Sequence, residues 1–212
     1  MTWIDPEVAE EFPELRLHEL TLDARSGRSG PELRERLRVL SDRFRGPQAV
    51  TLRRQPIPQA YRIFFRHIGL DPDVHRTPVE ALALERLKAG GFASRSVLDD
   101  ALTIAVMETG VPVWALDADR LEGEVGLRGA QRGERLGSGE YAHDLPAGRL
   151  VLADAAGPVG VLFGALAPGR GVGRGTTRIT LLALQVAGVP DIHAEEALWT
   201  VADILTGDAD PA

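Results

Sequence analysis

The stretch PGRGVGRGTTRIT, residues 168–180, combines glycines with three arginines and has the composition of a phosphate-binding loop. Glycine lets a backbone approach an anion closely, and a guanidinium group makes paired hydrogen bonds to phosphate oxygens. The spacing fits neither GxGxxG nor GxxxxGK(S/T), and the lysine of the second pattern is missing. Two interpretations remain: a flexible loop between two strands, or a loop whose amides and arginines contact RNA phosphates.

Two other stretches carry possible metal ligands. HIGLDPDVH, residues 67–75, has two histidines and two aspartates, but they span a helix end and a proline turn. A metal site needs three or four such groups converging from ordered elements, so we expect these aspartates to organise the turn. DADRLEG, residues 117–123, lacks the third acidic position of a calcium loop and is predicted to be a turn at a strand end. We predict no metal and no cofactor.

Nucleophilic catalysis has little support in the sequence. Ser138, His143 and Asp144 lie in one short polar loop, whereas a catalytic triad is assembled from separate segments, and no G-x-S-x-G elbow surrounds the serine. The chain contains no cysteine, which excludes a thiolate nucleophile, thiolate metal ligands and disulfides. These patterns alone predict no catalytic residue.

The net charge of −7 disfavours a nucleic-acid partner, but the positive charge is concentrated in parts of the chain. No acidic residue occurs between Asp154 and Asp191, and arginines crowd residues 25–54. Such local basic faces are compatible with RNA binding. The apolar runs are too short to span a bilayer, and the acidic N-terminus does not resemble a signal peptide. We therefore expect a cytoplasmic protein with no membrane contact.

The periodicity of apolar residues predicts helices before Val111 and mainly strands after it. Thr77, Pro78 and Glu80 form the pattern of a helix start with a capping box, and Gly90 and Gly110 are expected to end helices. The predicted helices cover residues 31–44, 60–69, 78–89, 97–109 and 193–205. The predicted strands cover residues 14–22, 111–116, 122–128, 149–154, 157–165 and 178–188. This order indicates one α+β domain, residues 1–205, with a largely antiparallel sheet and a flexible tail at residues 206–212.

Two segments match a known family pattern. GVPVWALDADRL, residues 110–121, matches the pattern G-x-P-x-x-A-x-D-x-D-x-(L/I), and Asp100 and Glu108 match the helix before it. GPVGVLFGALAPGRGVGRGTTRITLLAL matches a glycine-rich hairpin followed by a T-(T/K)-x-(I/V) strand. Over about residues 55–190 the chain resembles the B3/B4 domain of the phenylalanyl-tRNA synthetase beta subunit. In overall plan it is closer to the free-standing proteins that carry this domain alone.

The resemblance implies a tRNA or aminoacyl-tRNA partner, because the domain in the synthetase is an editing module that removes wrongly attached tyrosine from tRNA. That module uses a histidine before the D-x-D turn, a glutamate in the hairpin and an asparagine on the second helix. Here the histidine position is Trp114, the asparagine position is Thr103, and FGALAPGRGV contains no acidic residue. An indole donates a hydrogen bond but cannot take a proton, so we predict that the editing chemistry is absent. Trp114 either fills the pocket as core or forms a stacking wall.

The resemblance also gives the expected site residues. Those expected to line the pocket are Asp100, Thr103, Trp114 and Thr177. Those expected to contact RNA are first Arg170, Arg174 and Arg178, and second Arg62 and Arg66. The alternatives are a free-standing hydrolase of mischarged tRNA, for which Asp100 or Glu108 is the nearest ionisable group, and a protein that binds an amino acid or another small molecule. The sequence does not predict an oligomeric state.

Overall fold

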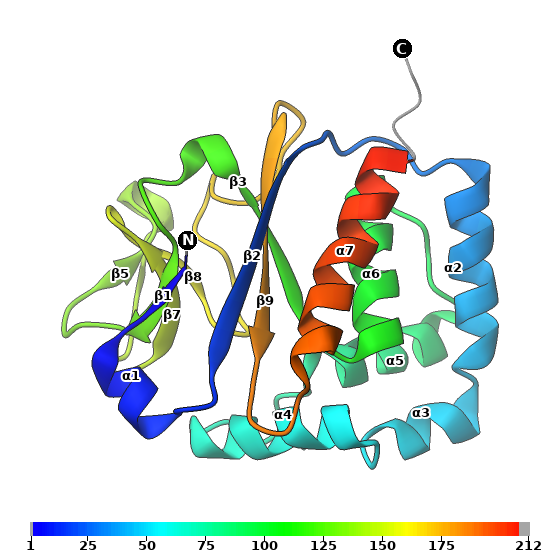
Figure 1. The fold of residues 1–212 in the computed structure, drawn as a ribbon, viewed down its shortest axis with the longest axis horizontal. Coiled ribbons are helices and arrows are strands. Elements are labelled where there is room, and N and C mark those ends of the chain that lie inside the picture. The colour runs from blue at the N-terminus through cyan, green and yellow to red at the C-terminus, as the bar shows by residue number, and fades with distance from the viewer. Residues whose placement is uncertain (1, 208–212) are drawn as a thin grey trace.

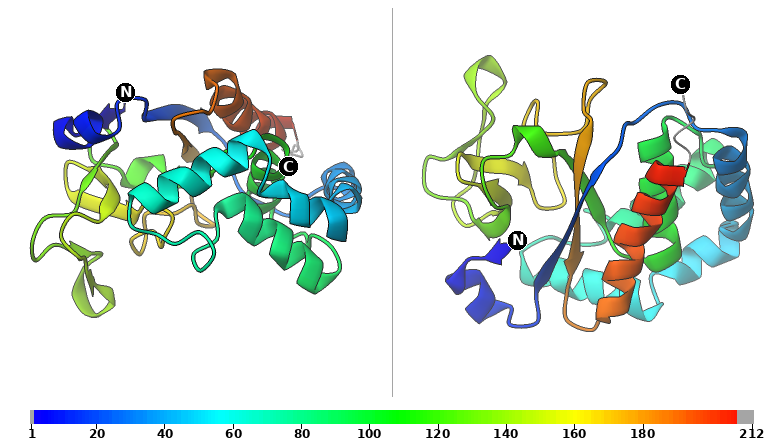
Figure 2. Two further views of the ribbon diagram at one scale, coloured as in Figure 1. Left: turned by 90° about the horizontal axis from the view of Figure 1, so that it is seen from below. Right: turned by 45° about the horizontal axis from the view of Figure 1, so that its top comes forward.

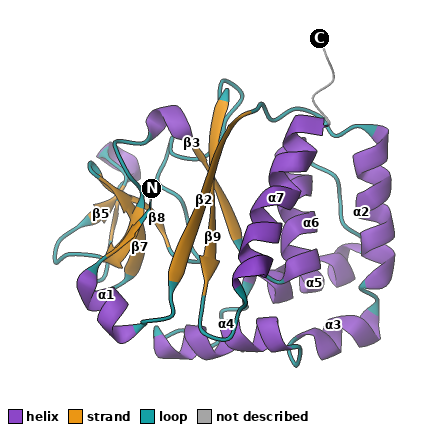
Figure 3. Ribbon diagram, viewed as in Figure 1, coloured by secondary structure: helices purple, strands orange, loops and turns teal. Residues whose placement is uncertain are grey.

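The computed structural model describes residues 2–207, which form two larger β-sheets with helices packed around them (Figure 1). Most helices precede residue 110 and most strands follow it, as the sequence predicts. Most of the helical part lies to one side of the strands (Figure 3). The predicted α+β class with largely antiparallel sheets is therefore confirmed. No helix among residues 2–207 is long and apolar enough to cross a membrane.

The central sheet has the strand order β2-β9-β3, and both neighbouring pairs are antiparallel. Its strands are β2 (Arg16–Asp23), β9 (Arg178–Gln185) and β3 (Val113–Asp117). In β9, which reads RITLLALQ, every residue after Arg178 is buried, as expected for a strand that is covered on both faces. The register places Trp114 of β3 opposite Leu182 of β9.

Helices α6 (Val97–Thr109) and α7 (Asp191–Gly207) pack against each other beside the central sheet. The other helices are α1 (Pro6–Glu11), α2 (Pro31–Arg43), α3 (Gly46–Leu52), α4 (Pro56–His67) and α5 (Pro78–Ala89). The predicted capping box of Thr77 and Glu80 begins α5, and left-handed glycines end α5 and α6. These local signals fix where α5 and α6 begin and end, and therefore which residues face the cavity between them.

The second sheet lies on the other side of the central sheet from α6 and α7 (Figures 1 and 2). Its order is β1-β4-β7-β8, with β1 and β4 parallel and the other pairs antiparallel. Gly126 of β4 is required here, because a Cβ at this position would lie 2.0 Å from the ring of Trp3. The strands of this part are β1 (Trp3–Ile4), β4 (Gly126–Gly129), β7 (Leu150–Asp154) and β8 (Gly157–Val161), with β5 (Arg135–Leu136) and β6 (His143–Asp144) as a separate pair. Two single-turn helices are η1 (Ala118–Arg120) and η2 (Gly139–Tyr141).

Several predicted boundaries differ from the structure. The strand predicted over residues 157–165 ends at Val161, because the chain turns at Phe163, which has a φ of 58°. Helices α1 and α3 are missing from the prediction, which had no apolar stripe on which to place such short elements. Helix α7 continues to Gly207, so residues 206 and 207 belong to a helix and not to a tail. The rest of the predicted tail, residues 208–212, lies outside the described residues.

Candidate functional site

A cavity of about 380 Å³ opens between α5, α6 and the start of β3, and two of the four predicted pocket residues, Asp100 and Thr103, line it. Asp100 is 1% exposed. Its carboxylate accepts hydrogen bonds from the hydroxyls of Ser29 and Ser94, both at 2.6 Å, and from the backbone N–H of Arg95 at 3.0 Å. These bonds occupy the carboxylate, which ties the segments before α2 and α6 to the wall of the cavity.

Thr103 lies one turn further along α6 and is partly exposed. Its hydroxyl donates to the backbone carbonyl of Asp99 at 2.8 Å, so the oxygen can still accept a hydrogen bond from a ligand. Glu85 and Arg95, which form an ion pair, also line the cavity. The sequence analysis missed both, because the pair joins α5 to the loop before α6 and no local pattern reports it.

Trp114 packs in an aromatic cluster. Its ring centroid is 5.6 Å from that of Phe163, which in turn lies 4.5 Å from Phe65 of α4. Because side chains alternate along a strand, Trp114 points to the opposite face of β3 from Val113, which lines the cavity. The indole is half-buried, so part of its surface packs as core and part stays accessible.

Thr177 is exposed and lies just before β9, where its carbonyl accepts a hydrogen bond from the N–H of Ala24 at 3.0 Å. Trp114 lies opposite Leu182 of β9, and Leu182 follows Thr177 by five residues. Thr177 therefore lies roughly 16 Å from Leu182 along the extended chain. The structure thus places Asp100 and Thr103 at one cavity, with Trp114 on the other face of β3 and Thr177 at the far end of β9.

The glycine-rich loop, defined here as residues 168–177, is fixed to the end of β3 by side-chain and backbone contacts. The carboxylate of Asp117 accepts a hydrogen bond from the hydroxyl of Thr176 at 2.7 Å and from the N–H of Asp119 at 3.1 Å. The N–H of Asp117 donates to the carbonyl of Arg170 at 3.0 Å, and that of Gly173 donates to the Thr176 hydroxyl at 3.0 Å. The DADRLEG segment is therefore a strand-end turn, as predicted, and it anchors the loop.

The three arginines of this region have different environments. Arg170 is largely buried, and its guanidinium donates to the Asp154 carboxylate at 2.8 Å and to the carbonyl of Arg120. Arg178 is exposed and lies 3.6 Å from the carboxylate of Asp119. Arg174 is exposed and forms no ion pair within residues 2–207. Arg174 is therefore the most available of the three, and Arg170 is committed to holding the loop.

Arg62 and Arg66, the second pair of predicted RNA contacts, also differ in their exposure. Arg62 is 5% exposed and donates to Glu80 at 2.8 Å and to Asp73 at 2.6 Å. Burial lowers the pKa of its guanidinium, but the hydrogen bond with Asp73 and the charge of Glu80 outweigh this effect and raise it. Arg62 is thus enclosed within the protein, whereas Arg66, one turn further along α4, is exposed.

Asp73 and Asp71 organise the turn after α4, as the sequence predicts. The Asp71 carboxylate accepts from the N–H of Asp73 at 2.9 Å, and Asp73 pairs with Arg62. The hydrogen bond from Arg62 holds the pKa of Asp73 below its usual value. In the described part of the chain, no three histidine, aspartate or glutamate side chains converge in a way that would hold a metal ion.

Residues 60–189, more than half of the chain, match the B3/4 domain family, and the chain belongs to that family. The resemblance drawn from the sequence is therefore confirmed. The chain is 35% identical over 94 residues to the phenylalanine–tRNA ligase beta subunit of Streptomyces avermitilis, covering 44% of this chain and 11% of that protein. It is 32% identical over 127 residues to the same subunit of Neisseria meningitidis, covering 58% and 14%. The chain thus spans only a small part of these relatives.

A solved structure is also similar to this chain. It is an N-terminal fragment of the phenylalanyl-tRNA synthetase beta-subunit from Pyrococcus horikoshii, with a TM-score of 0.44 and 11% sequence identity. The similarity covers 98% of this chain and 48% of that fragment.

Proposed function

We propose that this protein binds tRNA or aminoacyl-tRNA through the glycine-rich loop and does not hydrolyse the aminoacyl ester. The observation that carries the proposal is the anchored loop with Arg174 exposed on it and unpaired within residues 2–207. Membership of the B3/4 family supports the choice of tRNA, because the matching relatives are named as phenylalanine–tRNA ligase beta subunits.

The charge distribution also supports a polyanionic partner. The chain has no acidic residue from 155 to 190, so the only carboxylates near the loop are those brought by other segments. Asp117 and Asp154 are engaged with Thr176 and Arg170, which leaves Arg174 to attract phosphate. Arg178, whose contact with Asp119 is exposed and long, is the second candidate, since such a pair is weak in water.

The absence of hydrolysis is proposed from the side chains near β3. Trp114 packs against Phe163 and has no group that accepts a proton. The carboxylate of Asp100 accepts three hydrogen bonds, and Glu108 pairs with Arg36 at 2.8 Å. Both carboxylates therefore have structural partners, which supports a structural role for each rather than the activation of water. The cytoplasmic location expected from the sequence stays a prediction.

The test is binding of the full chain to total tRNA, uncharged and aminoacylated, across a salt series, with ester loss followed in the same samples. We expect salt-sensitive binding, and we expect Arg174→Gln to weaken it and to reduce the slope of log affinity against log salt by about one. The double variant R174Q/R178Q should reduce the slope further. Arg132→Gln replaces another exposed arginine, in the turn between β4 and β5; it is the matched control and should change neither quantity.

Each other outcome has a defined meaning. Ester loss faster than the spontaneous rate would contradict the non-hydrolytic part of the proposal and favour the editing hydrolase. Binding that Arg174→Gln and Arg132→Gln weaken equally would remove the loop from the proposal. No binding at low salt would reject an RNA partner altogether.

A further inference from the structure

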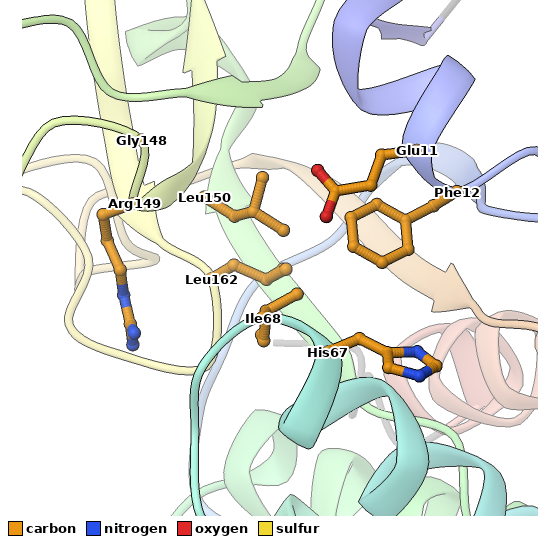
Figure 4. A pocket seen from close by; sticks show the side chains of 8 residues that line it. All are labelled: Glu11, Phe12, His67, Ile68, Gly148, Arg149, Leu150 and Leu162. Carbon is orange, nitrogen blue, oxygen red and sulfur yellow. The ribbon is translucent and has the colours of Figure 1, made fainter.

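A second cavity lies between the end of α1, the end of α4 and the start of β7, and it shares no lining residue with the α5–α6 cavity. Its volume is about 220 Å³. Figure 4 shows Arg149 on one side, Glu11 and Phe12 on the other, and Leu150, Leu162 and Ile68 between them. Glu11 and Phe12 precede residues 60–189, so this cavity is built partly from outside the region that matches the B3/4 family.

Three polar side chains around this cavity make no contacts that support the fold within residues 2–207. Within residues 2–207, the carboxylate of Glu11, the guanidinium of Arg149 and the imidazole of His67 form no ion pair or side-chain hydrogen bond. Glu11 is the last residue of α1, where the negative end of the helix disfavours a carboxylate. Its carboxylate points toward Leu150, whereas the ring of His67 points away from the leucines (Figure 4).

The walls of the cavity are held in place. The N–H of Phe12 donates to the carbonyl of Val8 at 2.8 Å, and the Phe12 ring packs edge-on against Phe64, with 5.2 Å between the centroids. On the other side, the N–H of Arg149 donates to the carbonyl of Pro146 at 3.1 Å, and its own carbonyl accepts from Ala130. The backbone on both sides of the cavity is therefore fixed, so a ligand would order only the side chains of Glu11 and Arg149.

We propose that this cavity binds a small zwitterion, with a carboxylate held by Arg149, an ammonium group held by Glu11, and an apolar body over Leu150, Leu162 and Ile68. Arginine is suited to the carboxylate because its guanidinium donates two parallel hydrogen bonds. The size fits a small body, since a cavity of roughly 150 Å³ holds a benzene molecule. The proposal is independent of RNA binding, because none of its residues lies in the glycine-rich loop.

Two ligands share this chemistry, an apolar amino acid and an apolar dipeptide. A neighbouring cavity of about 180 Å³ shares Glu11, Phe12 and His67 with the first, and is lined also by Ile63 and Phe64. It has room for a second apolar side chain, which a dipeptide supplies and a single amino acid does not. The two ligands differ in the distance between their charges, so their relative affinities report the span from Arg149 to Glu11.

The experiment is a titration of the ¹⁵N-labelled full chain, followed by amide NMR, with leucine and with leucyl-leucine. We expect shifts at Ile68, Gly148 and Arg149 with at least one of the two zwitterions. N-acetyl-leucine, which lacks the ammonium group, and leucinamide, which lacks the carboxylate, should each bind roughly ten- to a hundredfold more weakly than leucine, as loss of one charged hydrogen bond predicts. The acetylated and amidated dipeptides serve in the same way for leucyl-leucine.

The variants assign each charge to a side chain. Glu11→Gln should remove the preference for a free ammonium group, and Arg149→Gln the preference for a free carboxylate. Glu10→Gln and Arg132→Gln, both exposed and away from the cavity lining, are the matched controls and should bind as the parent does. The proposal is overturned if neither zwitterion shifts these amides at millimolar concentration, if the capped analogues bind equally well, or if Glu11→Gln and Arg149→Gln leave both preferences unchanged.

Discussion

Two arginines of this protein, Arg62 and Arg174, have opposite environments in the structure. Arg62 lies in the middle of α4, with its guanidinium enclosed and bonded to Glu80 of α5 and to Asp73. Arg174 lies on the glycine-rich loop, exposed and without an ion pair in the described part of the chain. Both were predicted as phosphate contacts, yet only Arg174 has the free surface that a phosphate contact requires.

The difference arises from which carboxylates the fold brings close. Asp73 and Glu80 follow Arg62 by 11 and 18 residues, and the turn between α4 and α5 folds them back onto it. Near the glycine-rich loop, Asp117 and Asp154 come from distant segments and already bind Thr176 and Arg170. An arginine is therefore structural or available according to its carboxylate partners, and the local sequence around it does not decide which.

The largest expected effect comes from Arg62→Ala. It leaves the buried carboxylate of Glu80 without its cation, which typically costs about 3–5 kcal/mol of unfolding free energy. Urea denaturation of the parent and the variant measures the loss. Arg66→Ala, one turn along the same helix and exposed, is the control and should change stability by no more than about 0.5 kcal/mol. Equal losses in the two variants would contradict the structural role of Arg62.

The second-largest expected loss of stability comes from removing the side chain that anchors the glycine-rich loop. Asp117→Ala removes the acceptor of Thr176 and should cost about 1–3 kcal/mol, as expected when a hydrogen-bonded group loses its partner. Amide hydrogen exchange in residues 168–177 should become faster, while exchange in α4 stays unchanged. Asp119→Ala is the control, because within residues 2–207 its carboxylate makes only the long contact with Arg178. Unchanged exchange in Asp117→Ala would show that the loop does not depend on this anchor.

A smaller expected effect is the pH dependence of the stability that the Arg62–Asp73 pair contributes. The hydrogen bond from Arg62 lowers the pKa of Asp73 in the folded protein, so the unfolded chain takes up protons first as pH falls. The contribution of Asp73 is therefore complete above its ordinary pKa of about 3.8 and is lost as pH falls through its folded pKa. The stability difference between the parent and Asp73→Asn should shrink over that range. A difference that stays constant with pH would mean that Asp73 does not pair with Arg62 in solution.

The parts that the sequence predicts correctly depend on neighbouring residues. Thr77 and Glu80 predict the start of α5 because a capping box spans a single turn, and Gly110 predicts the end of α6 because it adopts a left-handed conformation. The apolar run RITLLALQ predicts a strand for the same reason, since the signal lies in its own composition.

The parts that the sequence does not predict depend on contacts between distant residues. Asp117 and Thr176 are 59 positions apart, and no spacing rule connects them. Glu11 and Arg149 meet at one cavity only because β1 pairs with β4 and brings α1 beside β7. The sequence predicts one pocket lined by Trp114 and Thr103, but the alternation of side chains along β3 sends the indole to the other face.

The smallest expected effect on stability is that of Arg174→Gln, and it completes the comparison with Arg62. Because Arg174 is exposed and unpaired within residues 2–207, its replacement should change the unfolding free energy by no more than about 0.5 kcal/mol. The same variant is expected to weaken tRNA binding, so its effects on stability and on binding should separate. Urea denaturation and the salt-series titration measure the two quantities on one protein preparation. A loss of stability comparable to that of Arg62→Ala would mean that Arg174 holds the fold together, and any loss of binding would then follow from a disrupted loop.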